Sequence, residues 1–251
     1  MSSIARTASL RGKPAVQVHL LGRVDYELCL ALQQRLVYET SGRTDGQISL
    51  LICEHDGLIS VGRQGSRGHI RLRQRSLESH QLRVQWVNRG GGCVLHVPGQ
   101  LAIYPIVPLD WHGWTVGEYL ARLQDAFIDT LAELGISAHT RLGRHGVWGR
   151  TGQLAMLGAA VKGWVAYQGA FLNVSPAMHL LRRVQSDPWD DSPAGCLVAE
   201  RRQPVKMTRV RESLVRHLAA ALECDRYHVY SGHPLWSQCR EPRREPAQRV
   251  G

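Results

Sequence analysis

The residues best suited to chemistry gather around a run of three glycines at positions 90–92. Arg89 precedes this run and supplies a fixed cation, and His96 follows it and can titrate near neutral pH. Glycine backbones let a ligand approach the main chain closely. Because an apolar, strand-like run follows at 101–107, the pattern favours a binding loop beside a tunnel for an apolar chain with a polar mouth. A glycine-rich hairpin that binds nothing explains the same glycines equally well.

The composition is that of an ordinary globular protein. The chain has 251 residues, of which 43% are hydrophobic and 21% charged, enough for one domain with a sizeable core or at most two. No apolar run reaches the roughly 20 residues that span a bilayer. Residues 1–14 carry no apolar segment of the kind that directs secretion. We therefore expect a cytoplasmic protein.

Cysteine spacing and net charge restrict the possible ligands. The six cysteines stand far apart and form no Cys-x-x-Cys pair, which argues against a zinc site and favours reduced thiols. The net charge of +10 favours an acidic partner, such as a nucleic acid, an anionic membrane or an acidic protein. Solubility alone explains this charge equally well, and part of it falls in the segment 240–249.

Hydrophobic spacing predicts the elements that position the glycine run. Leucines repeat every four residues on one face of a helix that begins after Asp25, a good N-terminal cap. Thr115 and Glu118 form a capping box that opens a second helix, which ends at Gly135. The predicted strands are 16–21, 48–53, 58–61, 83–88, 101–107, 154–161 and 164–174, and a last amphipathic helix covers 208–223.

The order of these elements predicts the fold class. Strands and helices follow each other without a regular βαβ alternation, which indicates an α+β fold. We expect a single domain with a mixed β-sheet core flanked by helices. This domain would span residues 15–224, between a disordered N-terminus at 1–14 and a basic C-terminal tail at 225–251. The segments 105–114 and 175–193 are expected to be irregular.

Several short motifs stand in a fixed order along the chain. They are Leu21-Gly22 with Tyr26, Glu54-His55, Gly62-Arg63, the pattern Arg-Gly-Gly…His-x-Pro-Gly-Gln-Leu from Arg89 to Leu101, Gly146-Val147-Trp148, and the segment from Gly169 to Asn173. This set resembles the lipoyl(octanoyl) transferases, a family of the biotin/lipoate protein ligase superfamily. The resemblance implies a single domain of the biotin/lipoate protein ligase type. Members of that family move an octanoyl group from acyl carrier protein to a lysine of lipoyl domains.

The resemblance implies the partners and the binding residues of such an enzyme. The partners would be acyl carrier protein and the lipoyl domains of 2-oxoacid dehydrogenases or glycine cleavage protein, without nucleic acid, membrane, metal or cofactor. Backbone N–H groups near Leu157-Gly158 and Gly169-Ala170 would face the reacting carbonyl. The acyl-binding residues would be Arg89, Gly90, Gly91, Gly92, Cys93, Val94, Leu95, His96, Met156, Leu157, Gly158, Gly169, Ala170 and Phe171.

The reactive residues of that family are altered in this chain. The family places a lysine just before an Ala-x-Gly segment, where this chain has Gln153, and a cysteine in a Pro-Cys-Gly segment, where it has Ala194. A histidine of the family is replaced by Gln168. Glutamine is neutral and cannot lower a thiol pKa by its charge. Cys196, two residues beyond Ala194, is the candidate catalytic nucleophile. A buried structural cysteine is the alternative, and Cys93 is a second possible thiol.

Four functions are open from the sequence. The first is an octanoyltransferase that uses Cys196 as a displaced nucleophile, and the second is a homologue that binds an acyl chain or a lipoyl domain without turnover. Gln153 and Ala194 favour the second. The third is a ligase that activates its acid with ATP, but it would need a positioned lysine to hold phosphates. The fourth is a nucleic-acid binder, for which helix-turn-helix spacing, zinc ligands and interleaved aromatic and basic residues are lacking.

Overall fold

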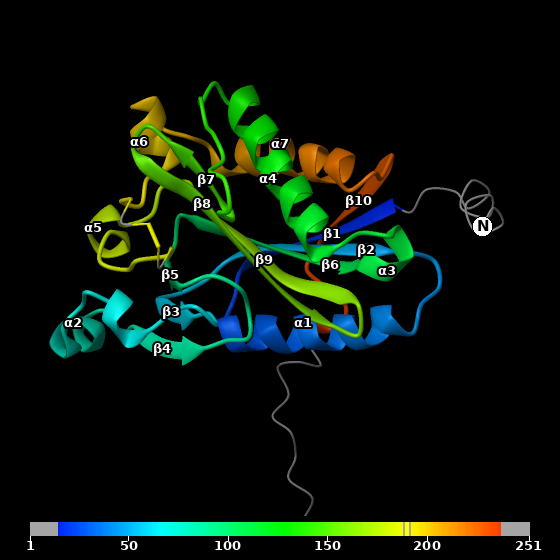
Figure 1. The fold of residues 1–251 in the computed structure, drawn as a ribbon, viewed down its shortest axis with the longest axis horizontal. Helices are drawn as coiled ribbons and strands as arrows, with labels where there is room; N and C mark the ends of the chain where they lie inside the picture. The colour runs from blue at the N-terminus through cyan, green and yellow to red at the C-terminus, as the bar shows by residue number, and fades with distance from the viewer. Residues whose placement is uncertain (1–14, 188, 191, 237–251) are drawn as a thin grey trace, which may run out of the picture.

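The computed structural model describes residues 15–187, 189, 190 and 192–236, so the expected disordered segment 1–14 lies outside the described residues. The described chain folds around two β-sheets, with helices on both faces of the larger one (Figure 1). This mixed architecture confirms the predicted α+β fold. No helix in the described part of the chain is both long and apolar enough to cross a membrane.

A seven-stranded sheet forms the centre of the protein. Its order is β10-β1-β2-β6-β9-β8-β7. β1 pairs in parallel with β10 and β2, and the other neighbours are antiparallel. β8 and β9 correspond to the predicted strands 154–161 and 164–174, and they form an antiparallel hairpin that turns after Lys162. The strands are β1 (Ala15–Arg23), β2 (Ile48–Glu54), β6 (Gln100–Pro108), β7 (Gly146–Gly149), β8 (Gly152–Lys162), β9 (Val165–Asn173) and β10 (Arg226–Ser231).

Helices cover both faces of this sheet because its strands alternate between two apolar cores. Within β2, Ile48, Leu50 and Ile52 face one core, whereas Leu51 and Cys53 face the other. α4 (Val116–Glu133) and α7 (Met207–Ala221) cover the first core. α1 (Tyr26–Ser41) covers the second core, on the opposite face (Figure 1).

A three-stranded sheet carries the glycine run. Its order is β4-β3-β5, and the glycines lie in the loop between β4 and β5. β3 therefore holds both ends of the loop, because it pairs with each of the strands that flank the glycines. The strands are β3 (Leu58–Val61), β4 (Arg83–Trp86) and β5 (Cys93–His96). The short elements η2 (Arg67–His69) and α2 (Gln74–Ser79) lie between β3 and β4 in the chain.

The helix starts follow the predicted caps. The Asp25 side chain accepts a hydrogen bond from Leu28 N–H at the start of α1, and Thr115 and Glu118 form the capping box of α4. Two expected loops contain short helical turns. In 105–114, β6 continues to Pro108 because it stays paired with β2 and β9, and α3 (Leu109–His112) follows. Within 175–193, α5 (Met178–Leu181) forms, and α6 (Leu197–Arg201) follows the loop.

The end of the described chain differs from the expected tail. Residues 226–231 form β10, which pairs in parallel with β1. The high charge of 225–251 suggested a tail, but Tyr227, Val229 and Tyr230 belong to the residue types that favour strands. Pairing also covers the edge that β1 would otherwise expose. Residues 237–251 lie outside the described part of the chain.

Candidate active site

The glycine loop lies directly on β8. Gly90 N–H donates to Ala159 O at 2.9 Å, and Gly92 N–H donates to Ser186 O at 3.1 Å. A side chain at Gly158 would place its Cβ only 2.4 Å from Gly90 O. The two backbones approach this closely because glycine stands at position 158. The glycines thus serve a close contact between the loop and the central sheet.

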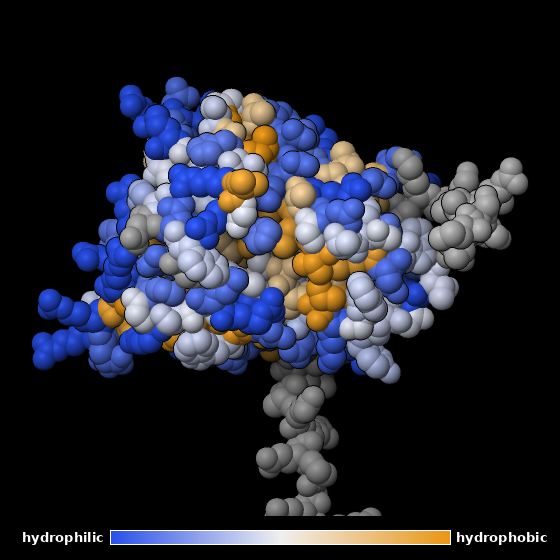
Figure 2. Space-filling model, viewed as in Figure 1, coloured by the Kyte–Doolittle hydropathy of each residue, from blue (hydrophilic) through white to orange (hydrophobic). Residues whose placement is uncertain are grey.

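A cleft of about 560 Å³ opens where the glycine loop, β8, the start of α4 and two loops meet. Apolar side chains of β8 and α4 and two arginines line it, which suits a ligand with an apolar chain and a polar end. Figure 2 shows hydrophobic residues at the surface in the middle of the face drawn, in the region of β8, β9 and α4, with hydrophilic residues around them. The lining includes Arg63, Gln64, Val116, Leu120, Arg144, His145, Gln153, Ala159, Ser186, Asp187 and Trp189.

A small inner cavity adjoins the cleft. It measures about 20 Å³ and shares Gln153, Met156 and Ser186 with the cleft lining. A cavity of that size holds about one water molecule. An eight-carbon chain would therefore enter only if side chains moved. Met156 is suited to such a movement because methionine adapts its shape readily.

A buried polar network holds the glycine loop from behind. Arg89 is 0% exposed, and its Nη2 donates to the Ser60 carbonyl oxygen at 3.0 Å and to Ser60 Oγ at 2.9 Å. Ser60 Oγ in turn forms a hydrogen bond with His96 Nε2 at 2.8 Å, and the tautomer of His96 decides which of the two atoms donates. Burial lowers the pKa of His96, and His55 and Arg89 lower it further. Arg89 and His96 therefore position the loop from below the cleft.

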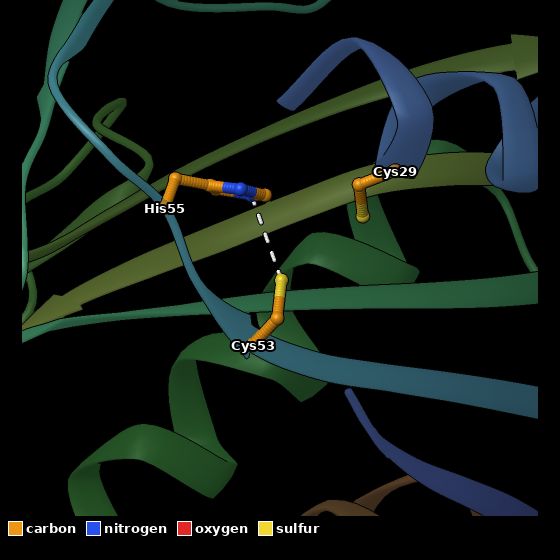
Figure 3. A group of neighbouring side chains, drawn as sticks. All are labelled: Cys29, Cys53 and His55. Atoms are coloured by element: carbon orange, nitrogen blue, oxygen red, sulfur yellow. Dashed lines mark hydrogen bonds between the residues drawn. The ribbon is translucent and has the colours of Figure 1, made fainter. Parts of the chain in front are cut away.

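Cys29, Cys53 and His55 form a second buried cluster (Figure 3). Their side chains point toward one another, and one possible metal-binding atom from each lies within 4.8 Å of the others. His55 Nδ1 donates to Val24 O, and Nε2 accepts from the Tyr104 hydroxyl, each at 2.8 Å. Burial lowers the pKa of His55 to about 4 and raises the pKa of the Cys53 thiol. With both ring nitrogens bonded, His55 is a neutral packing residue that ties β2 to β6 and to the start of α1.

The two altered positions of the sequence lie against each other. Gln153 N–H donates to Pro193 O, and Gly195 N–H donates to Gln153 O, both at 2.9 Å. Ala194 thereby pairs with Gln153 across a short parallel bridge. Gln153 is 5% exposed, and its Oε1 accepts from Ser186 Oγ at 2.6 Å. A neutral amide and a methyl group stand together where the resemblance implied an ammonium and a thiol.

The residues predicted to bind the acyl group fall into three groups. Gly90, Gly91, Met156, Leu157 and Gly158 line the cleft. Cys93, Val94, Leu95 and Phe171 line the inner cavity, together with Met156 and Ala194. Arg89, Gly92, His96, Gly169 and Ala170 are buried outside both linings. Cys196 is 3% exposed and belongs to neither lining.

Lys162 stands at the wrong end of β8 to replace the missing lysine. The strand runs for 11 residues from Gly152 to Lys162. At about 3.3 Å per residue, Gln153 and Lys162 lie roughly 30 Å apart. Lys162 is exposed at the hairpin, and Arg182 and Arg183 are exposed as well.

Sequence reasoning missed the residues that reach the cleft from its loops. Ser186, Trp189 and Arg144 come from two loops that carry no periodic hydrophobic signal. Arg144 lies over the Trp189 ring at 5.5 Å and pairs with Asp187 at 3.6 Å, so the two loops hold each other. The segment 143–152 is rich in glycine and basic residues, and its first residues line this side of the cleft.

The fold is that of the lipoate protein ligases. A lipoate-protein ligase A bound with ATP superposes with a TM-score of 0.73 and 15% identity, covering 90% of this chain and 92% of that one. A lipoate protein ligase from T. acidophilum with bound lipoic acid superposes with a TM-score of 0.71, also at 15% identity, covering 90% and 92%. Likeness at this level of identity establishes the fold alone.

The chain belongs to the lipoyl protein ligase A/B catalytic domain family, which matches residues 25–219. Its relatives place it with acyltransferases of the lipoyl(octanoyl) transferase type, as the resemblance implied. The octanoyltransferase of Geobacter metallireducens is 32% identical over 194 residues, covering 77% of this chain and 87% of that protein. The octanoyltransferase of Cytophaga hutchinsonii is 30% identical over 227 residues, covering 83% and 93%. That of Citrifermentans bemidjiense is 37% identical over 156 residues, covering 62% and 72%.

Proposed function

We propose that this chain transfers an octanoyl group from octanoyl-acyl carrier protein to a lysine of a lipoyl domain, as a step of lipoate biosynthesis. The observation that carries the proposal is the cleft between the glycine loop and β8, which adjoins a small inner cavity with both apolar and polar lining residues. Burial of an acyl chain there would contribute about 0.8 kcal/mol per CH₂ group. Met156 and Phe171 are the side chains that would make room for it.

Charge supports an acidic carrier as the donor. The chain has a net charge of +10, and Arg63 and Arg144 line the cleft. An acidic carrier protein would be attracted to such a surface over distances of about 10 Å or less at ordinary salt. For the acceptor, a bipartite lipoate protein ligase of this fold from Thermoplasma acidophilum has been analysed with its E2 lipoyl domain. The cytoplasm is the expected location of this reaction.

The resemblance predicts a thioester at Cys196 as the intermediate. Cys196 is the residue before the first turn of α6, and its side chain is buried and makes no cap hydrogen bond. It lies two residues from Ala194. To reach the cleft, its thiol would have to shift by about two residues along the chain. That shift would break the two backbone hydrogen bonds that Gln153 makes with Pro193 and Gly195. Cys196→Ser tests this route, because it should then abolish both the octanoyl adduct and the transfer.

Binding without turnover is a second candidate function. The contact between Gln153 and Ala194 favours it, because neither residue can form a thiolate or lower the pKa of one. A protein of this kind would hold octanoyl-acyl carrier protein or a lipoyl domain in the same cleft. It would leave the mass of the lipoyl domain unchanged.

Intact-mass analysis separates the two functions. The protein is incubated with octanoyl-acyl carrier protein and an unmodified lipoyl domain, and the masses of all three proteins are followed. We expect the lipoyl domain to gain one octanoyl group, and a domain whose acceptor lysine is changed to arginine is the control. A carrier that binds the protein while the domain stays unmodified would overturn the proposed transfer and establish the binding function.

A further inference from the structure

An acyl transfer needs hydrogen-bond donors for the carbonyl oxygen, which gains negative charge when the thioester is attacked. The backbone beside the cleft offers few such donors. All three N–H groups of the glycine run are bonded: Gly90 donates to Ala159 O, Gly91 to Gln64 Oε1 and Gly92 to Ser186 O. Leu157 N–H donates to His145 O at 3.0 Å. The donor is therefore to be sought among the side chains.

Gln153 offers a donor at the junction of the two cavities. Its Oε1 accepts from Ser186 Oγ at 2.6 Å, a distance typical of O–H···O bonds and short for N–H···O bonds. The carboxamide is thus oriented with its oxygen toward Ser186 and its Nε2 on the other side. Among the described residues, nothing accepts a hydrogen bond from Nε2. Nε2 lies against Gly146, where an added Cβ would be 2.6 Å from it, next to the cleft-lining residues 143–145. Gln153 itself lines both the cleft and the inner cavity, which places this donor beside a carbonyl bound where the two meet.

The same junction holds no activated nucleophile among its described residues. Ala194 presents a methyl group, and Cys196 lines neither cavity. Cys93 lines the inner cavity, but burial raises the pKa of its thiol, and its Sγ is bonded to Ser66 O. Ser186 donates its hydrogen to a neutral amide, which is not a base and cannot take the proton.

We propose, on the basis of the octanoyl transfer proposed above, that Gln153 Nε2 is the donor to the thioester carbonyl and that the octanoyl group passes directly to the acceptor lysine. The neutral lysine amine attacks the carbonyl carbon, a C–N bond forms, and the C–S bond breaks. The sulfur leaves as a thiolate and takes up the proton that the new amide nitrogen releases. The products are the octanoylated lysine and the free thiol of the carrier, and no bond to this chain forms at any stage.

Direct transfer has a kinetic consequence that a covalent intermediate lacks. Carrier and lipoyl domain must be bound at the same time, because no acyl group stays on the protein after the carrier leaves. Initial rates measured against both substrates should therefore give intersecting reciprocal plots. An acyl-enzyme would give parallel plots and an octanoyl adduct on the protein.

Variants at position 153 test the role of the amide. Gln153→Glu has the same shape and keeps an acceptor for Ser186, but it lacks the donor. We expect Gln153→Ala and Gln153→Glu to lower kcat by about 100-fold, as for the loss of one oxyanion donor. Ser186→Ala should lower kcat by about tenfold and leave KM for the carrier unchanged, because Ser186 only orients the amide. Cys196→Ser should keep the intersecting pattern of reciprocal plots, because no acyl group is bound to this chain in direct transfer.

A double variant designed to introduce the covalent route completes the experiment. Gln153→Lys combined with Ala194→Cys places an ammonium and a thiol in the contact that Gln153 and Ala194 make now. We expect this double variant to acquire an octanoyl adduct and parallel plots. If it folds, as judged by thermal unfolding, and forms no adduct, the assignment of Gln153 to the reacting carbonyl is wrong.

The remaining outcomes distinguish this inference from the proposed function. Parallel plots for the wild-type protein, or an adduct on Cys196 whose loss stops transfer, would overturn direct transfer and leave octanoyl transfer intact. A kcat that is unchanged in Gln153→Glu would also overturn it. If the wild-type protein never octanoylates the lipoyl domain, the proposed function fails, and the inference fails with it.

Discussion

Two walls of the cleft differ in how their polar groups are bonded. The glycine-loop wall consists of Gly90 and Gly91 with the residues behind them, and the β8 wall consists of Gln153 and residues 156–159. Behind the glycine loop, Arg89, Ser60 and His96 are buried and bonded to one another. On the β8 wall, Gln153 Oε1 accepts from Ser186 Oγ, and the Gln153 amide nitrogen has no acceptor among the described residues. The loop wall follows the family pattern that the sequence revealed, whereas the β8 wall departs from it.

This difference separates residues that build the fold from residues that determine the reaction. A change behind the loop would leave buried donors and acceptors without partners, which costs stability. A change of side chain at Gln153 or Ala194 leaves the sheet pairing in place, because the backbone makes the bridge between them. The protein can therefore keep its cleft while its chemistry changes.

The largest effect is expected where the two walls touch. Gly158→Ala would place a Cβ 2.4 Å from Gly90 O and push the glycine loop away from β8. We expect a loss of about 3 kcal/mol in the free energy of unfolding, measured by urea denaturation, as for overpacking in a rigid site. Gly90→Ala is the matched control, since its nearest neighbour would be Ala159 O at 3.7 Å. Equal stability of the two variants would show that the walls are not in close contact.

The next effect tests the buried network of the loop wall. Ser60→Ala removes the hydroxyl that accepts from Arg89 and is hydrogen-bonded to His96. Because one N–H of the buried Arg89 guanidinium then loses its acceptor, while the Ser60 carbonyl still accepts from Nη2, we expect a loss of about 2 kcal/mol in the free energy of unfolding. Ser186→Ala, on the other wall, should change stability much less. A reversed order of the two variants would contradict the division between scaffold and reaction.

A pH-dependent effect is expected from His55 beneath the loop wall. Its pKa is about 4 in the folded protein against an ordinary value of 6.5, so the folded state favours the neutral ring. The unfolded chain therefore takes up a proton first as the pH falls, and stability declines from pH 6.5 down to about 4. One proton corresponds to a slope of about 1.4 kcal/mol per pH unit.

Replacing this histidine isolates its contribution. His55→Gln should make the plot of unfolding free energy against pH less steep in this range, measured by urea denaturation at several pH values. His179→Gln, at an exposed position on α5, controls for the substitution itself. A slope that stays unchanged in His55→Gln would show that the ring is protonated in the folded protein.

Local sequence signals predicted most of the fold because they act over short distances. The capping box at Thr115, the cap at Asp25 and the hairpin at Lys162 each depend on residues a few positions apart. β10 was missed because its pairing with β1 joins two ends of the chain, and its charged surroundings suggested a tail. The edge of a sheet is not visible in the local pattern of a strand.

The sequence predicted where the glycine loop of the site lies, but not which side chains contact one another around the reacting group. The glycine motif located the wall at Gly90 and Gly91, and the family pattern pointed to Gln153 and Ala194 as the altered pair. Ser186 was missed because it comes from a loop without periodicity, and its role arises from a contact across 33 residues. The cluster at Cys29, Cys53 and His55 was missed because it joins separate elements.

The smallest effect is expected in the loop that carries Ser186 and Ala194. Arg141 holds this loop, since Nη1 donates to Ser192 Oγ at 2.7 Å and pairs with Asp190, while its guanidinium lies over the Trp148 ring at 4.8 Å. Arg141→Gln removes an ion pair that is partly exposed, and such pairs contribute less than about 1 kcal/mol. The loop should loosen without unfolding of the sheet.

The expected result is a two- to threefold rise in KM for the carrier with little change in kcat, because the lost ion pair contributes less than about 1 kcal/mol. Added salt should raise KM of the wild-type protein in the same way and affect Arg141→Gln less, because screening weakens the same pair. Arg150→Gln, whose guanidinium bonds to backbone oxygens of α6, is the control. A fall in kcat of more than tenfold in Arg141→Gln would mean that the loop orients the reacting groups. The β8 wall would then depend on its ion pairs as strongly as the loop wall depends on its buried hydrogen bonds.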